Sequence, residues 1–308
     1  MSNIKNLPYR YQAFGIHFAS CIPCPQLKPS TATPNVEIKA GTVPDCLAQI
    51  RKQGRRYQAT DDELLLKIPD VAAYWVKGGE SIVIDRAPQS DDAAVQLYLW
   101  GFSIGALLDQ RGLLVLHGSA VVVQGSAVLF LGKSGAGKST LATAFHKLGY
   151  WLAADDICAI EVTPEHLMLH PSFPQVKLWD DACQKLDREQ GFIHQKSIEP
   201  IYSRPGKYAV YFENSFWQHP LPLKRIYLLT PSDSQSLTLQ PITGLQKIPL
   251  LQQQTHGFPL VQYMGYGERH LQQCIRVASQ IPLVKVVRPL DTFLLEELVD
   301  LIEADVKV

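Results

Sequence analysis

The segment GKSGAGKS, residues 132–139, matches the pattern G-x-x-x-x-G-K-[ST], which binds nucleotide phosphates. Glycines at this spacing let successive backbone N–H groups point at phosphate oxygens, and a following helix adds its positive N-terminal end. Lys138 would reach the β- and γ-phosphates, and the Ser139 hydroxyl would bind Mg²⁺. The alternative, a chance glycine-rich turn, is disfavoured because an apolar strand precedes the segment and a helix follows it. The predicted phosphate-binding residues are Gly132, Ser134, Gly135, Ala136, Gly137, Lys138, Ser139 and Thr140.

Two adjacent acids and one histidine flank this loop. Asp155 and Asp156 end the apolar run YWLAADD, with Asp155 placed 17 residues after Lys138. One carboxylate could bind Mg²⁺ while the other acts as general base toward an attacking hydroxyl, unless the pair only begins a turn or one acid alone matters. His117 lies 21 residues before Lys138, beside a glycine, where it could supply charge or proton transfer. Taken alone, a histidine there would more often be structural.

The hydrophobic pattern predicts the elements that position these residues. From residue 113 it indicates a hairpin turning at Gln124 and Gly125, then the glycine loop, a helix, and the strand that ends in the acids. Strands and helices follow up to an amphipathic last helix, so we expect an α/β fold. Residues 1–88 carry short apolar runs separated by turn residues, which predicts a β-rich, antiparallel N-terminal domain. Residues 89–308 would form the catalytic domain.

An apolar helix is predicted directly after Pro88, with Ser90, Asp91 and Asp92 available as its N-cap and first-turn acids. It is apolar on most sides, which favours burial between the two parts of the chain. Its Gly101 and Gly105 are spaced for close helix packing.

Composition excludes several function classes. Lys plus Arg and Asp plus Glu number 29 each, so no global field attracts the chain to nucleic acid or anionic lipid. The N-terminus lacks an apolar signal-peptide region, and no run of 18 apolar residues occurs. These features predict a cytoplasmic protein with no membrane and no nucleic-acid partner. The six cysteines are scattered, and the lone CxxC of Cys21 and Cys24 lacks the second pair that a zinc site needs.

The stretch from His117 to Val162 resembles the catalytic domain of the HPr kinase/phosphorylase family, in which His-Gly, a glycine loop and Asp-Asp follow in this order. The resemblance implies a P-loop fold of the HPr kinase/PEP carboxykinase type, with ATP and Mg²⁺ as cofactors. Carried over to this chain, Lys138 would stabilise the transferring phosphoryl group and Asp155 would be the general base, with His117 beside it. Ser139 and Asp156 would bind Mg²⁺, although the two aspartates could exchange roles.

The layout of the whole chain looks more like the HPr-kinase-related proteins of bacterial peptide-modification clusters, some of which are similar to lasso-peptide precursor kinases. This resemblance implies a serine kinase whose partner is a peptide or small protein carrying the acceptor serine. Arg204 and Lys207, in YSRPGKYAV, are candidates for contacts with phosphate or partner. The alternatives are a metabolite kinase and a nucleotide-dependent switch or ATPase, and a homo-oligomer remains open. The first 88 residues do not resemble the N-terminal domain of the HPr kinases.

Overall fold

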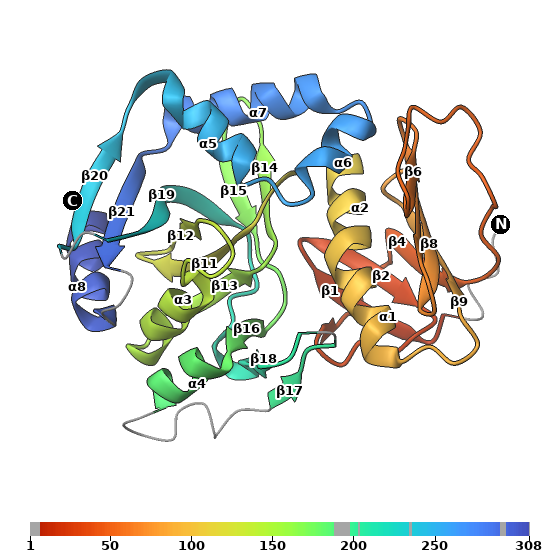
Figure 1. The fold of residues 1–308 in the computed structure, drawn as a ribbon, viewed down its shortest axis with the longest axis horizontal. Coiled ribbons are helices and arrows are strands. Elements are labelled where there is room, and N and C mark those ends of the chain that lie inside the picture. Colours follow the sequence, from red (N-terminus) through yellow and green to blue (C-terminus); the bar gives the residue numbers. More distant parts are fainter. Residues whose placement is uncertain (1–6, 188–197, 203, 234–235, 290–293, 308) are drawn as a thin grey trace.

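The computed structural model describes residues 7–187, 198–202, 204–233, 236–289 and 294–307 (Figure 1). The fold is mixed α/β, as predicted, and the described chain contains three sheets. The first sheet has the spatial order β3-β1-β2-β4-β9-β8-β7-β6-β5. Its strands are β1 (Tyr9–Ala13), β2 (Ile16–Ser20), β3 (Lys28–Pro29), β4 (Val36–Ala40), β5 (Lys52–Gln53), β6 (Tyr57–Ala59), β7 (Glu63–Ile68), β8 (Ala72–Lys77) and β9 (Ser81–Arg86).

This first sheet uses only residues before Pro88, but it is not wholly antiparallel. The hairpins β1–β2, β6–β7, β7–β8 and β8–β9 are antiparallel, with turns at the predicted TDDE and KGGES positions. β4, however, pairs in parallel with β2 on one side and with β9 on the other. The antiparallel prediction is wrong for these two pairs, because they join strands that no tight turn connects. The domain boundary at residue 88 stays a prediction.

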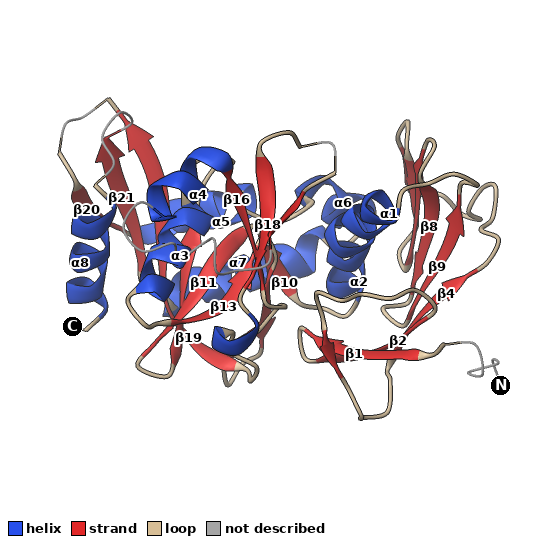
Figure 2. Cartoon of the chain, turned by 90° about the horizontal axis from the view of Figure 1, so that it is seen from below, coloured by secondary structure: helices blue, strands red, loops and turns tan. Residues whose placement is uncertain are grey.

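The predicted helix after Pro88 is present but is divided into three parts. α1 (Asp92–Tyr98) is capped by Asp91, whose carboxylate accepts from the N–H groups of Ala93 and Ala94. The π-helix η2 (Leu99–Ser103) follows without a break and leads into α2 (Ile104–Gln110). Figures 1 and 2 show these helices between the first sheet and the remainder of the chain. Their apolar residues share one core with that sheet and with Val115 and Ile157.

The second sheet carries the loop that the sequence predicts to bind phosphate, called the phosphate-binding loop below. Its spatial order is β10-β14-β15-β19-β12-β11-β13, and β21 pairs with both β19 and β20. β12 runs parallel to β19, and β19 runs parallel to β21, whereas β11 and β12 form the predicted antiparallel hairpin. The strands are β10 (Leu114–Leu116), β11 (Gly118–Val123), β12 (Ser126–Leu131), β13 (Trp151–Asp155), β14 (Cys158–Val162), β15 (Leu167–His170), β19 (Leu221–Ser232), β20 (Thr238–Ile242) and β21 (Leu283–Pro289).

Helices cover both faces of this second sheet. Val128 and Phe130 of β12 pack on one face with α3 (Lys138–Lys147) and α8 (Leu295–Val306), while Leu129 and Leu131 face α5 (Lys247–Gln253) and α7 (Gly267–Gln280). This alternation is the reason that β12 is apolar throughout. The remaining elements are β16 (Gln175–Trp179), α4 (Asp180–Asp187), β17 (Ile198–Pro200), β18 (Lys207–Tyr211), η3 (Glu213–Ser215), η4 (Gly244–Gln246) and α6 (Phe258–Tyr263). β16, β18 and β17 form the third sheet.

Across the described ranges, no helix is both long enough and apolar enough to cross a membrane.

Candidate active site

The phosphate-binding loop connects β12 to α3, as the sequence predicts. Gly132 has φ 148° and Gly137 has φ 93°, which L side chains rarely adopt. A Cβ added at Gly132 would lie 2.8 Å from the carbonyl oxygen of Leu229, so only glycine fits there. The loop therefore passes close to the neighbouring strand and ends at the N-terminus of α3, where free backbone N–H groups favour an anion.

Two side chains from distant segments support this loop. The Arg288 guanidinium donates to the carbonyl oxygen of Ala136, through Nη2 at 2.9 Å and Nε at 3.2 Å. The Gln254 side-chain oxygen accepts from the Gly132 N–H at 3.0 Å, while the Gln254 carbonyl oxygen accepts from the His117 N–H at 2.7 Å. Gln254 thus ties the loop to the segment that carries His117.

Lys138 is buried at the start of α3, with 7% of its surface exposed. Its ammonium donates to the carbonyl oxygens of Gly132 at 2.8 Å and Lys133 at 3.2 Å. Burial lowers the pKa of Lys138, against the opposing attraction of Asp155 and Asp156. A cation held inside the curve of the loop by carbonyl oxygens alone is placed to bind phosphate oxygens.

Asp155 ends β13 and faces the phosphate-binding loop. Its Oδ1 accepts from the Ser139 hydroxyl at 2.8 Å and from the Ser119 hydroxyl at 2.6 Å, and its Oδ2 accepts from the Lys177 backbone N–H at 2.8 Å. Only 5% of its surface is exposed, and burial raises the pKa of Asp155 even though these three donors oppose the change. Asp155 is therefore the acid next to Ser139.

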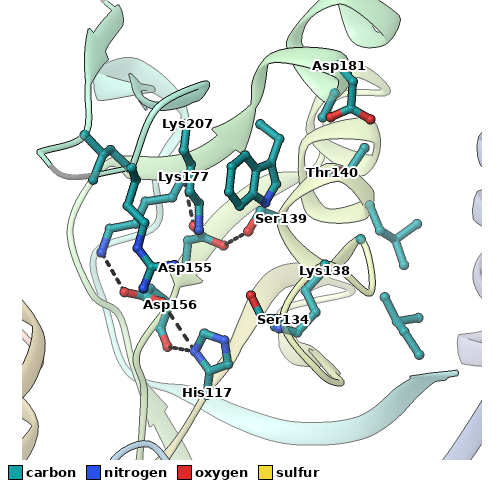
Figure 3. A pocket seen from close by; sticks show the side chains of 18 of the residues that line it. His117, Ser134, Lys138, Ser139, Thr140, Asp155, Asp156, Lys177, Asp181 and Lys207 are labelled. Carbon is teal, nitrogen blue, oxygen red and sulfur yellow. Dashed lines mark hydrogen bonds and ion pairs between the residues drawn. The ribbon is translucent and has the colours of Figure 1, made fainter. Parts of the chain in front are cut away.

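Asp156 has different side-chain partners from Asp155, because the Asp156 backbone is left-handed at φ 69° and turns the chain away from β13. Its Oδ2 pairs with the Lys177 ammonium at 2.6 Å, and its Oδ1 lies 3.3 Å from His117 Nδ1. Burial alone would raise the pKa of Asp156, but the charges of Lys177 and His117 hold this pKa well below its usual range. Figure 3 shows the two carboxylates pointing to different partners.

The protonation of His117 follows from a second contact. Its Nδ1 lies 3.0 Å from the backbone carbonyl oxygen of Asp156, which can only accept a hydrogen bond. Nδ1 therefore carries a proton, which it can share between the carbonyl oxygen and the carboxylate of the same residue. His117 thus fixes the orientation of Asp156 by contacting both the backbone carbonyl and the carboxylate of that residue.

One cavity of about 880 Å³ connects these groups. Of the predicted site residues it is lined by His117, Ser134, Gly135, Gly137, Lys138, Ser139, Thr140, Asp155 and Asp156, and by the further candidates Arg204 and Lys207. Gly132 and Ala136 belong to the same loop but are not among the residues that line the cavity. This volume is in the upper part of the range for ligand pockets, which leaves room for a nucleotide and a second molecule.

Sequence reasoning missed many residues of this cavity, among them Lys177, Trp179, His256 and Arg288. Lys177 and Trp179 belong to β16, which ends where α4 begins. Lys207, which starts β18, pairs with Trp179 in the third sheet, and its ammonium lies 5.5 Å from the centre of the Trp179 ring. Arg288 could have been found, since it comes near the carboxyl end of a strand, where α/β folds bind ligands.

The residues fit Mg²⁺ as a nucleotide-bound ion. Magnesium usually keeps several waters and binds through one or two protein oxygens together with substrate phosphates. The Ser139 hydroxyl and the Asp155 carboxylate supply two adjacent hard oxygen donors at the loop. Within the described part of the chain no group of three or more His, Cys, Asp or Glu side chains could form a metal site alone. Cys21 and Cys24 are free thiols.

Comparisons with known proteins find structural matches but no sequence match. No family model matches the sequence, and no curated protein matches it significantly. The fold is similar to the structure of the Hpr(Ser) kinase/phosphatase from Coxiella burnetii, at 13% identity and a TM-score of 0.33, over 63% of this chain and 88% of that chain. That likeness carries no argument about function, so the family and its branch stay predictions.

Proposed function

We propose that this chain is a Mg-ATP-dependent kinase that transfers the γ-phosphate to a serine hydroxyl of a peptide or small protein. The observation that carries the proposal is the separation of the two aspartates. Asp155 contacts Ser139 of the phosphate-binding loop, whereas Asp156 contacts His117 and the Lys177 ammonium. A second carboxylate in this position can serve as the base for an attacking nucleophile, and the acceptor experiment below distinguishes a serine hydroxyl from water.

The contacts support a division of roles opposite to the one carried over from the family resemblance. Ser139 and Asp155 would bind Mg²⁺, which when bound neutralises charge on the phosphates. Asp156 would be the general base. The reason is geometric: the Ser139 hydroxyl lies 2.8 Å from Asp155, and Asp156 is turned toward His117.

The transfer itself would be a single in-line displacement. The serine oxygen forms a bond to the γ-phosphorus while the bond from that phosphorus to the β–γ bridging oxygen breaks, and the electron pair leaves with ADP. Asp156 accepts the serine proton. A carboxylate of low pKa suffices, because in a loose transition state the proton leaves late. Lys138 stays on the β- and γ-phosphates and stabilises their charge.

The experiment is incubation of the purified chain with Mg²⁺, γ-labelled ATP and a library of serine-containing peptides, with mass spectrometry to locate added phosphate. We expect label in peptide serines, and none when EDTA removes the metal. Release of free phosphate with no dependence on an acceptor would instead support an ATPase. Label on free serine or another small alcohol, with none on peptides, would support a metabolite kinase.

A further inference from the structure

The cavity extends past the two aspartates to a set of side chains that the proposed chemistry does not use. This acceptor wall consists of Tyr98, Gly101 and Phe102, at the junction of α1 and η2, together with His256. The His256 ring lies 6.3 Å from the His117 ring and 6.1 Å from the Phe102 ring, measured between centroids. A row of rings therefore leads from the residue that orients Asp156 to the π-helix.

The two ends of the cavity differ in what they can hold. At the end beyond Thr140 it is lined by Arg288 and by Leu295 and Leu298 of α8, beside the N-terminus of α3. Phosphates bound on the loop would direct a nucleoside toward this end. The attacking hydroxyl must approach the γ-phosphorus from the opposite side, in line with the leaving oxygen. Asp156, as the proposed base, must lie on that side, and His117 and His256 lie beside it.

The π-helix itself is a second observation. π-helical turns are rare and occur frequently at functional sites. Here the turn leaves Phe102 with 48% of its surface exposed, although it borders a cavity. A Cβ added at Gly101 would meet no heavy atom within 4 Å, whereas one at Gly105 would lie 2.8 Å from His256 Nδ1. Gly105 lets His256 pack against the helix, and Gly101 leaves open space beside Phe102.

Charge adds a third observation. Arg56 and Arg204 line the same cavity and are exposed, and neither side chain pairs with a carboxylate in the part of the chain that the structure describes. Lys138 already serves the nucleotide phosphates, and Lys177 is paired with Asp156. An arginine fork that remains without a partner at a cavity edge suits a carboxylate of the incoming molecule.

We propose that the acceptor wall binds a bulky apolar side chain next to the acceptor serine, and that the acceptor is a polypeptide segment that also carries a carboxylate. The inference rests on the proposed kinase function. It goes further in naming the chemistry of the segment: an apolar neighbour over Gly101 and Phe102, and an acidic group within reach of Arg56 or Arg204. A free hydroxy amino acid has no side chain left to fill the wall.

The test uses the full chain and two variants of the wall. Gly101→Leu fills the open space with a residue that favours helix, and Phe102→Ala removes the exposed ring. The probes are serine peptides that differ in one neighbour, Leu or Ala, and in one flanking charge, Glu or Lys, with free serine alongside. Leu245→Ala, which truncates an apolar side chain that is 82% exposed and lies outside the cavity, is the matched control.

For the wild-type chain we expect the lowest KM with the Leu and Glu peptide. Gly101→Leu and Phe102→Ala should each raise that KM by about tenfold to a hundredfold, the value of one buried apolar side chain. Both should retain the wild-type Kd for Mg-ATP and the wild-type melting temperature, and Leu245→Ala should change none of these values. Gly101→Ala should give a smaller rise in KM than Gly101→Leu.

Two results would overturn the inference alone, namely wild-type peptide KM values in both wall variants, or equal use of free serine and peptides by the wild-type chain. Absence of transfer to any hydroxyl, with Mg-ATP still bound, would overturn the proposed function and this inference with it.

Discussion

The Asp156→Asn variant tests whether the general base and the Mg²⁺ ligand are different residues. Asparagine has the same shape, so its side-chain oxygen can still accept from Lys177 or His117, but it cannot take a proton from serine. Loss of a positioned general base lowers kcat by about 100-fold to 10,000-fold. Because Asp156 does not contact Ser139 in this structure, we expect the Kd for Mg-ATP to stay within about twofold of wild type.

The same exchange at Asp155 should have a different effect. Asp155 accepts three hydrogen bonds while almost fully buried, and an asparagine that keeps its oxygen on the two serine hydroxyls turns its amide group toward the Lys177 backbone N–H, which cannot accept. One unsatisfied buried group costs about 1–3 kcal/mol of folding free energy. Asp155→Asn should therefore melt at a lower temperature, and its affinity for ATP should fall in Mg²⁺ while remaining near wild type in EDTA.

Calorimetric titration of ATP with and without Mg²⁺, and single-turnover transfer to the peptide library, measure these differences. The role assignment would be refuted if Asp156→Asn kept the wild-type rate, or if Asp155→Asn lost transfer with its metal-dependent affinity intact. The second pattern would restore Asp155 as the base.

Further expected outcomes concern the loop and the buried histidines. Lys138→Met should weaken ATP binding about 10-fold to 100-fold in calorimetry, since it removes a charge-assisted contact to phosphate. Gly132→Ala should lose about 1–3 kcal/mol of stability in urea unfolding, because its Cβ would meet the Leu229 carbonyl at 2.8 Å; unchanged unfolding would contradict this packing. Burial lowers the pKa of His256 to about 4 and also lowers that of His270, from the ordinary 6.5, so both are neutral in the fold. Because protonation of these histidines is harder in the fold than in the unfolded chain, the free energy of unfolding should decrease as pH falls from 6.5 toward 4. The melting temperature of His256→Gln should depend less on pH between 6.5 and 4 than that of the wild type.

Local signals made the phosphate-binding loop, the β11–β12 hairpin and the Asp91 cap predictable from the sequence. Each depends on residues close together in the chain, where residue type and spacing decide the backbone. The parallel pairs of β4 were not predictable, because they join strands that are separated by other elements. The π-turn within the first long helix was hidden for another reason, since its hydrophobic pattern is the same as that of an α-helix.

The sequence indicated part of the candidate site's membership but not its arrangement. The sequence brought His117, Lys138, Ser139 and the two aspartates together, yet it could not show which carboxylate faces Ser139. That choice depends on the left-handed backbone of Asp156 and on Lys177, which reaches it from β16. Both are tertiary effects. The sequence of two adjacent aspartates contains no signal that tells one aspartate from the other.

The shared core of the first sheet and the helices α1 to α2 limits how this chain can be divided. Leu99, Ile104 and Leu107 are fully buried there with Phe18, Ile38 and other residues of the first sheet. A chain that begins at residue 89 would expose this apolar helix surface to water, and we expect it to aggregate during expression unless residues 1–88 are supplied in trans. The helices that border the cavity therefore depend on the first sheet for the burial of their apolar surface.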